Sequence, residues 1–246
     1  MNLLRVEGVV RHFGGVRAVD GVSFGLAAGE CAALIGPNGA GKSTLFALVA
    51  GQQRCDAGQV LFDGADIGRA APAQRARQGL ARTFQTAAAF ASMTVLQNVQ
   101  LALAAHAGGL DPWRPLWRRH EGDARGLLAR VGLAGQAGRA AADLAYADLK
   151  RLELAVALAG SPRLLLMDEP TAGMASGERA ALMNLVAELA AAGGLTVLFT
   201  EHSMDVVFGY ARRLLVMSRG RLIADGAPEA VRELPVVQAA YFGEPA

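Results

Sequence analysis

Runs of apolar residues along the chain follow strand and helix patterns. Short, uninterrupted apolar runs predict buried parallel strands at 31–35, 163–167, 195–199 and 214–217. Strand-like runs near the N-terminus predict an antiparallel sheet formed by 3–10, 22–26 and 59–62. Helical segments are predicted at 44–50, 94–105, 123–131, 178–192 and, as short pieces, 228–241. The chain is therefore expected to fold as an α/β protein with an antiparallel edge sheet.

Two of the predicted helices, 94–105 and 123–131, form a helical lobe inserted into the core. The loop between them holds Trp113 and Trp117 among prolines and arginines. These tryptophans are expected to pack on the lobe, with contact to a partner or a membrane surface as the alternative. We therefore expect one domain over 1–246, with its core at 1–85 and 161–246 and a helical subdomain at 86–160.

A glycine-rich segment follows the first predicted parallel strand. Residues 36–43 read GPNGAGKS, a complete G-x-x-x-x-G-K-[ST] phosphate-binding loop between a strand and a helix. Its backbone N–H groups can turn toward an anion, and the helix N-terminus adds about half a positive charge. We expect Lys42 to reach the outer phosphates and Ser43 to offer its hydroxyl to Mg²⁺. The expected nucleotide contacts are Asn38, Gly39, Ala40, Gly41, Lys42, Ser43 and Thr44.

An acidic pair ends the predicted strand at 163–167, where residues 163–170 read RLLLMDEP. Asp168 is expected at the C-terminal edge of the sheet, where its carboxylate can hold the Mg²⁺ shell. Glu169 is the candidate general base for the water that attacks the γ-phosphate. Acidic pairs after strands are usually only solvated, so it is their combination with the phosphate-binding loop that predicts an ATPase.

Composition narrows the remaining function classes. The 246 residues carry a formal charge of only +2, which argues against a protein that coats nucleic acid. Two cysteines, Cys31 and Cys55, provide no disulfide framework and indicate a cytosolic protein. No apolar run approaches the ~20 residues that span a bilayer, and the N-terminus has a strand pattern where a secretory signal would be apolar. Any membrane role is therefore expected to depend on a partner.

The order of these motifs resembles, over essentially the whole chain, the nucleotide-binding subunits of ABC transporters. The resemblance implies that Phe13 stacks on adenine and that Val19 also contacts the nucleotide. Gln85, in the RTFQ run at 82–85, matches the glutamine that touches Mg²⁺ and water and hinges the helical subdomain. His202 matches the switch histidine that contacts the γ-phosphate. Catalysis is thus assigned to Glu169, His202 and Gln85, and metal binding to Ser43, Gln85 and Asp168.

The LAYAD run at 144–148 stands where the family places its signature loop. The resemblance implies that this loop acts on the ATP bound by a second subunit, through Ala145, Tyr146, Ala147 and Asp148. Ala145 replaces the family serine, so the hydroxyl contact is lost, although backbone N–H groups can still reach a phosphate. Ala175 similarly replaces an aspartate that helps to couple the two sites.

Within the family, the runs at 82–85, 93–95, 144–146, 201–204 and 240–243 resemble the ATPase of branched-chain amino-acid importers. This implies ATP and Mg²⁺ as cofactors and a second ATP-binding subunit, either an identical copy or a paralogue. It also implies transmembrane permease subunits, an external substrate-binding protein acting indirectly, and a position on the cytoplasmic face of the membrane. No nucleic-acid partner is expected. The alternatives are an exporter ATPase of the lipopolysaccharide type and a soluble, non-transport ABC ATPase or regulator.

A docking groove for the permease is the last feature that the resemblance implies. In the family, the groove beside the glutamine at the position of Gln85 receives a short cytoplasmic helix of the membrane subunit. Phe84, Phe90 and Met93 are expected to line this groove here.

Overall fold

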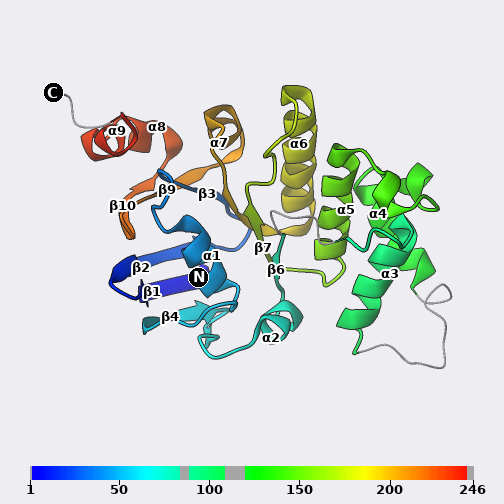
Figure 1. Ribbon diagram of the computed structural model, residues 1–246, viewed down its shortest axis with the longest axis horizontal. Helices are drawn as coiled ribbons and strands as arrows, with labels where there is room; N and C mark the ends of the chain where they lie inside the picture. Colours follow the sequence, from blue (N-terminus) through cyan, green and yellow to red (C-terminus); the bar gives the residue numbers. More distant parts are fainter. Residues whose placement is uncertain (1, 84–88, 109–119, 243–246) are drawn as a thin grey trace.

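The computed structural model of the chain describes residues 2–83, 89–108 and 120–242. Two sheets lie together at the centre of the molecule, and the helices α3, α4 and α5 stand to one side of them (Figure 1). Within the described residues, this arrangement matches the predicted α/β core with an antiparallel sheet and a separate group of helices. The positions predicted for Gln85, Trp113 and Trp117 lie outside the described residues.

The larger sheet has the strand order β10-β9-β3-β8-β7-β6. Its members are β3 (Cys31–Ile35), β6 (Leu80–Arg82), β7 (Leu164–Asp168), β8 (Thr196–Thr200), β9 (Arg213–Ser218) and β10 (Arg221–Gly226). All neighbours are parallel except β9 and β10. Because β3, β7 and β8 run in the same direction, the residues that follow them meet at one edge of the sheet.

The smaller sheet is antiparallel, with the order β2-β1-β4-β5. It consists of β1 (Asn2–Phe13), β2 (Val16–Ala27), β4 (Ala57–Phe62) and β5 (Ala65–Asp66). The predicted strands at 3–10, 22–26 and 59–62 are confirmed, although β1 and β2 extend further and bring Phe13 opposite Val16 at the tip of their hairpin.

The helices are α1 (Lys42–Val49), α2 (Pro72–Arg77), α3 (Val95–His106), α4 (Glu121–Arg130), α5 (Tyr146–Leu158), α6 (Ser176–Gly193), α7 (Met204–Tyr210), α8 (Pro228–Arg232) and α9 (Pro235–Phe242). Short 3₁₀ turns occupy Ala134–Gln136 and Ala141–Asp143. The helices predicted at 94–105, 123–131 and 178–192 are confirmed, with ends shifted by one or two residues, as expected for helix termini. Thr94 caps α3, because its hydroxyl accepts from the Gln97 backbone at 3.1 Å.

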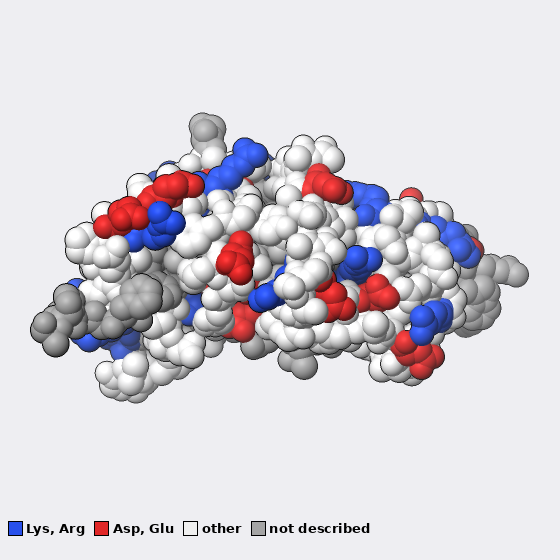
Figure 2. All heavy atoms as spheres, turned by 90° about the horizontal axis from the view of Figure 1, so that it is seen from above, with Lys and Arg blue, Asp and Glu red and all other residues white. Residues whose placement is uncertain are grey.

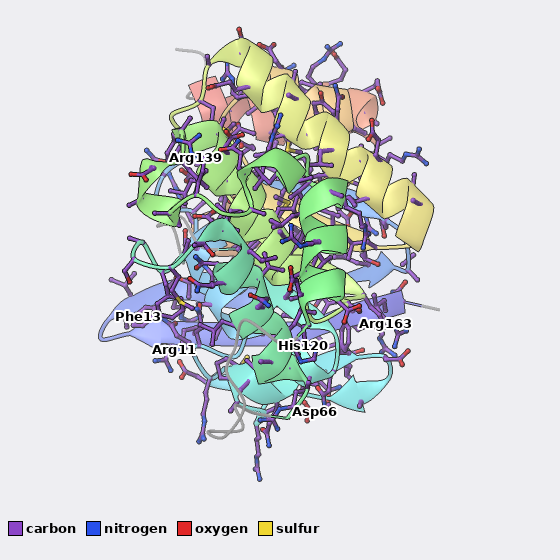
Figure 3. All side chains as sticks on the ribbon, turned by 90° about the vertical axis from the view of Figure 1, so that its right-hand side faces the viewer. Arg11, Phe13, Asp66, His120, Arg139 and Arg163 are labelled. Atoms are coloured by element: carbon purple, nitrogen blue, oxygen red, sulfur yellow. The ribbon has the colours of Figure 1, made fainter. Side chains whose placement is uncertain are left out.

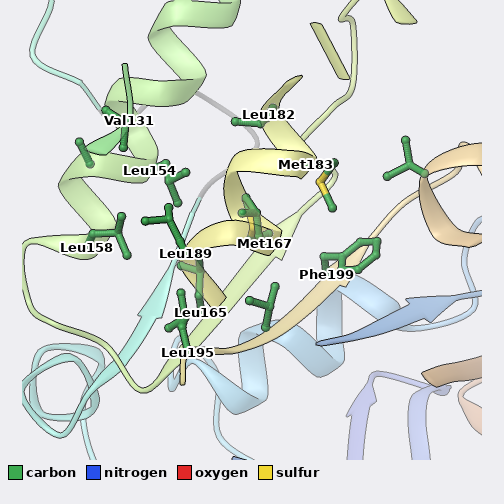
Figure 4. Packing of buried hydrophobic residues seen from close by; sticks show 14 of the residues in the cluster. Val131, Leu154, Leu158, Leu165, Met167, Leu182, Met183, Leu189, Leu195 and Phe199 are labelled. Atoms are coloured by element: carbon green, nitrogen blue, oxygen red, sulfur yellow. The ribbon is translucent and has the colours of Figure 1, made fainter. Parts of the chain in front are cut away.

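The parallel strands divide their side chains between two cores. Leu164 and Leu166 face a core shared with α1 and the antiparallel sheet. Leu165 and Met167 face the opposite core, where they pack with Leu189 of α6 and other residues of α5 and α6 (Figure 4). Successive side chains of a strand point to opposite faces, so an uninterrupted apolar run is buried on both sides.

Helix α2 was not predicted from the sequence. It contacts the C-terminal end of α1 through Arg75. Arg75 of α2 is 1% exposed. Its guanidinium donates to the carbonyls of Leu48 at 2.8 Å and Val49 at 2.7 Å, in the last turn of α1. Carbonyls in the last turn lack the amide of a following turn, and although the Leu48 carbonyl also accepts from the Gly51 amide at 3.2 Å, Arg75 caps the C-terminus of α1.

Candidate nucleotide-binding and catalytic site

The phosphate-binding loop leaves β3 and enters α1 along a tightly packed path. Gly36 has φ 150° and Gly41 has φ 103°. A Cβ atom would lie 2.1 Å from the Met217 carbonyl oxygen at Gly36, and 2.2 Å from the Ala18 carbonyl oxygen at Gly41. The loop is also tied to the turn after β9, because the Gly220 amide donates to the Ala40 carbonyl at 3.0 Å. The loop therefore has its shape before any ligand binds.

Lys42 lies folded back inside this loop and is 7% exposed. Its ammonium donates to the carbonyl oxygens of Gly36 at 2.6 Å and Pro37 at 3.1 Å. Burial lowers the pKa of Lys42, while the carboxylates of Glu169 and Asp168 act in the opposite direction. A polyphosphate would bring further negative charge to this buried cation.

Asp168 ends β7 and is 9% exposed. Thr200 donates its hydroxyl to Asp168 Oδ1 at 2.7 Å, and Arg82 donates to Oδ2 at 2.8 Å. A carboxylate has about four acceptor positions, so both oxygens can still accept from the water shell of a metal ion. The described residues contain no group of three or more His, Cys, Asp or Glu that could enclose a metal. One carboxylate and the Ser43 hydroxyl fit Mg²⁺, which keeps its waters and takes further oxygens from phosphates.

Glu169 and His202 form the second half of the site. The Glu169 backbone has φ 48°, an uncommon conformation for a residue with a side chain, and its amide donates to the carbonyl of Thr200 at 3.1 Å. Its carboxylate Oε1 lies 2.9 Å from Nε2 of His202. His202 follows β8 and remains half-exposed. The strained backbone thus places a carboxylate beside an imidazole at the carboxyl edge of the sheet.

A hollow of about 420 Å³ joins the phosphate-binding loop to Glu169 and His202, whereas Asp168 is not in its lining. Its volume lies within the usual range of about 300–1,000 Å³ for small-molecule sites. Its lining consists of Val16, Arg17, Ala18, Asn38, Gly39, Ala40, Gly41, Lys42, Ser43, Thr44, Glu169, His202 and Arg219. A larger hollow of about 740 Å³ lies between α4 and α6, but its lining has one carboxylate and no histidine. The smaller hollow is therefore identified as the site by its lining residues and not by its volume.

Val19 does not belong to this lining, and our prediction for it is wrong. Its side chain is 0% exposed and packs in the core beneath the antiparallel sheet. Ala18 and Val16 line the hollow in its place. Neighbouring strand residues point to opposite faces, so an error of one position moves a side chain from the site to the core.

Two arginines of the lining, Arg17 and Arg219, escaped the sequence reasoning. Arg219 has φ 49° in the turn between β9 and β10, and its neighbour Gly220 is the residue bound to the phosphate-binding loop. The Arg219-Gly220 pair signals a tight turn in the sequence. Nothing in the sequence indicates that this turn lies beside the loop.

Phe13 lies at the tip of the β1–β2 hairpin and is 43% exposed. The Arg11 guanidinium lies 4.9 Å from the centroid of its ring, and the two labelled side chains are neighbours in Figure 3. Arg11 is itself held by Asp56 at 2.8 Å. Phe13 is therefore a supported, exposed ring beside Val16 of the hollow, with surface available for stacking.

The residues predicted to form the signature loop lie apart from the hollow. Ala145 is the N-cap of α5 and makes no side-chain cap, and Tyr146 is 46% exposed. The Tyr146 hydroxyl donates to the Ala172 carbonyl at 3.1 Å, and Asp148 accepts from Gln136 at 2.6 Å. None of the residues 145–148 is in the described lining of the hollow. The chain thus does not bring these four residues to the hollow beside its own phosphate-binding loop.

The glycine-rich loop before α1 and the acidic end of β7 define a P-loop nucleoside triphosphatase. The family model described as ABC transporter matches residues 19–172. The branched-chain amino-acid transport ATP-binding protein LivG of Escherichia coli K12 is 38% identical, over 98% of each chain. BraF of Pseudomonas aeruginosa, with the same description, is 37% identical over 98% of each chain.

Solved structures agree with the sequence comparisons. A nucleotide-free ATP-binding cassette of an ABC transporter has a TM-score of 0.88 and 35% identity, and covers 99% of this chain and 100% of its own. The ADP conformation of the cassette MJ1267 has a TM-score of 0.86 and 36% identity over the same shares of each chain. The chain belongs to the ABC transporter family and is one of its ATP-binding cassettes, the ATPases of that family.

Proposed function

We propose that this chain is the ATP-hydrolysing subunit of an importer of branched-chain or related amino acids. Its similarity to LivG and BraF over nearly the whole chain supports this class of cargo. The observation that carries the enzymatic part is the Glu169–His202 pair, 2.9 Å apart, in the same hollow as Lys42.

In this proposal, the residues Asn38, Gly39, Ala40, Gly41, Lys42, Ser43 and Thr44 hold the phosphates. Phe13 stacks on adenine, and Ser43 and Asp168 hold Mg²⁺, with Gln85 as a further metal contact outside the described residues. Bound Mg²⁺ would neutralise part of the phosphate charge. Phosphate oxygens would replace the loop carbonyls as acceptors for Lys42, because an anionic oxygen attracts the ammonium more strongly than a neutral carbonyl does.

Glu169 acts as the general base in this scheme. Its carboxylate accepts a proton from the water that attacks the γ-phosphate, and His202 contacts the same phosphate through its imidazole. The contact between Glu169 and His202 holds the imidazole next to the carboxylate that acts as the base. The described backbone of Glu169 is anchored to β8, so the base cannot drift away from the phosphate without breaking that anchor.

Two copies, or one copy and a paralogue, would complete each site. The signature loop at 145–148 is separate from the hollow of its own chain and exposed at Tyr146, as a surface that acts on another subunit requires. A two-fold axis would place each α5 N-terminus against the nucleotide of its partner. Because Ala145 has no hydroxyl, the contact of this position with the phosphate would be made by backbone N–H groups.

The permease would dock in a hollow of about 330 Å³ between the core and the helical subdomain. Its lining is rich in small residues, including Ala73, Ala76 and Ala157, and also contains Arg82 and His106. Small residues allow a short helix to approach closely. Phe90 and Met93 are absent from the lining of this hollow, and Phe84 lies outside the described residues, so their place in the docking groove stays a prediction. The division into a core at 1–85 and 161–246 and a subdomain at 86–160 is part of this proposal.

Attachment to the inner face of the membrane would come from the permease. Within 2–83, 89–108 and 120–242, no helix is long and apolar enough to cross a bilayer. On the face shown in Figure 2, acidic and basic side chains are interspersed and no field of one sign appears. This face therefore offers no footprint for a polyanion. The comparisons favour an importer over a lipopolysaccharide exporter or a soluble, non-transport ATPase or regulator.

The enzymatic proposal is tested with Glu169→Gln. The amide cannot accept the proton of the attacking water, so turnover should fall by roughly 10²–10⁴-fold while ATP binding persists. The exposed Glu188 supplies the matched control, because Glu188→Gln makes the same change on the surface of α6. Turnover of Glu169→Gln at the rate of the control would refute the assigned role.

The docking proposal is tested with Ala73→Glu. Ala73 is exposed on α2, so the change should fill the hollow without affecting the core. The variant should hydrolyse ATP as an isolated subunit but fail to co-purify with the permease subunits. Ala129→Glu, on an exposed face of α4 away from this hollow, is the control. Normal assembly of a folded Ala73→Glu subunit would place the permease elsewhere.

A further inference from the structure

Glu201 is a buried carboxylate directly before His202. It is 4% exposed. Its Oε1 accepts from the Thr171 amide at 2.9 Å and from the Thr171 hydroxyl at 2.6 Å. Its Oε2 accepts from the amide of His202 at 3.2 Å. One side chain therefore joins the loop that follows β7 to the residue that follows β8.

Thr171 belongs to a tight turn that begins at Glu169. The Ala172 amide donates to the Glu169 carbonyl at 3.2 Å, and the Met174 amide donates to the Thr171 carbonyl at 3.2 Å. Thr171 is 2% exposed, so its hydrogen bonds are shielded from water. The carboxylate of Glu201 thus holds the backbone on which Glu169 is mounted, and its other oxygen holds the backbone of His202.

We propose that Glu201 is the positioning residue that fixes the distance between Glu169 and His202. This inference rests on the proposed roles of those two residues. Glu201 belongs neither to the phosphate-binding loop nor to the acidic pair at 168–169, so neither motif gives its carboxylate a role. It touches no reacting atom and acts through the two backbones that it joins.

The three hydrogen bonds require a carboxylate. All three partners donate, and an ionised carboxylate accepts on both oxygens. Glutamine has the same shape, but its amide nitrogen donates, so one of the two sides would meet a donor–donor contact. Glu201→Gln should therefore release either Thr171 or His202 while leaving the volume unchanged.

The test compares Glu201→Gln with the parent subunit in steady-state ATP hydrolysis. The kcat should fall by roughly 10–100-fold, as displacement of a catalytic group by about 1 Å can cause. The KM for ATP should stay within about three-fold, because the phosphate-binding loop is untouched. Thr171→Val should act in the same direction, and Thr171→Ser should restore most of the rate, because only the serine keeps the hydroxyl.

A second readout is independent of turnover. The chain has four histidines, so the imidazole NMR signals can be assigned by loss of one signal in His202→Ala. Glu201→Gln should move the His202 signal and leave those of His12, His106 and His120 in place. Glu178→Gln is the control, because Glu178 lies in the first turn of α6 and accepts from the Ala175 amide at 3.1 Å, so its hydrogen bond involves neither Thr171 nor His202.

The outcomes separate the two levels of the proposal. Parental kcat and an unmoved His202 signal in Glu201→Gln, beside an inactive Glu169→Gln, would overturn the positioning role alone. Turnover by Glu169→Gln at the parental rate would overturn the proposed function itself. If Glu201→Gln fails to fold, the pair Thr171→Val and Thr171→Ser decides the question, and equal rates for the two would refute the inference.

Discussion

The N-termini of α1 and α5 are the two helix ends assigned to phosphates, and they are built differently. The end of α1 has glycines at its turn, Lys42 in its first turn and no acidic residue there. It is also anchored by Gly220. The end of α5 begins at Ala145, has no side-chain cap and carries Asp148 in its first turn. Both ends expose backbone N–H groups, but only one adds positive charge to them.

This difference indicates that the two helix ends have different roles: α1 binds the nucleotide, and α5 completes the site of a partner subunit. The loop before α1 has its geometry and its cation in place within one chain, so it can bind a nucleotide alone. The negative charge of Asp148 opposes an anion, even though Gln136 and Arg151 contact its carboxylate at 2.6 and 3.8 Å. We therefore expect α5 to add little affinity and to act on a nucleotide that a partner already holds.

The largest effect is expected at the fixed shape of the loop before α1. Gly41→Ala should lower the free energy of unfolding by roughly 2–6 kcal/mol, because strain at positive φ costs about 1–3 and overpacking about 1–3. Gly39→Ala is the control, because Gly39 also has positive φ, at 78°, but its added Cβ would meet open space. Urea unfolding of the nucleotide-free subunit measures both. Equal losses would mean that the loop has no tightly packed geometry.

The next effect concerns the cation. Lys42→Ala should weaken ATP binding by roughly 10–100-fold, since a hydrogen bond to a charged group contributes about 1.5–3 kcal/mol. Calorimetry gives the affinity, and circular dichroism checks the fold. Arg125→Ala, at an exposed cation of α4, should change neither. If a folded Lys42→Ala subunit bound ATP with unchanged affinity, Lys42 would not be what distinguishes α1 from α5 in phosphate binding.

A smaller effect is expected when α5 receives the side-chain cap that it lacks. Ala145→Ser should raise the free energy of unfolding by roughly 0.5–2 kcal/mol, because the serine hydroxyl can accept from an amide of the first turn. It should also raise turnover of the dimer by restoring a hydroxyl beside the phosphate. Ala142→Ser, an exposed position away from this cap, is the control for thermal unfolding. A variant no more stable than its control would contradict the assigned N-cap.

The smallest effect tests how α5 is held. Tyr146→Phe removes the hydrogen bond to Ala172 and should cost about 0.5–1.5 kcal/mol, near the lower limit because the side chain is half-exposed. Amide hydrogen exchange should become faster in the first turn of α5. Tyr210→Phe is the comparison, since Tyr210 bonds to Ala180 and Asn184 of α6. If exchange in α5 became faster in Tyr210→Phe but not in Tyr146→Phe, the hydrogen bond of Tyr146 would not be the contact that holds α5.

Much of the fold could be predicted because its signals are local. Uninterrupted apolar runs located β3, β7, β8 and β9, and helical spacing located α3, α4 and α6. The elements that were missed, α2, α7, β5, β6 and β10, have two to seven residues each, too few to establish a period. No residue range was predicted for the longer helix α5. Val19 was misplaced for a related reason. A strand pattern says that alternate residues share a face, but not which face meets the ligand.

The sequence by itself determined the chemistry of this site, because the phosphate-binding loop and the acidic pair at 168–169 are contiguous segments whose spacing is part of their function. Only the tertiary structure decided which distant groups serve them. Arg75, Glu201 and Arg219 are charged residues that composition would assign to the surface. The fold instead buries Arg75 under α1 and Glu201 beneath His202, and it brings Arg219 to the nucleotide hollow. A buried charge is tolerated only where several partners converge on it, and that convergence exists only after the strands and helices have packed.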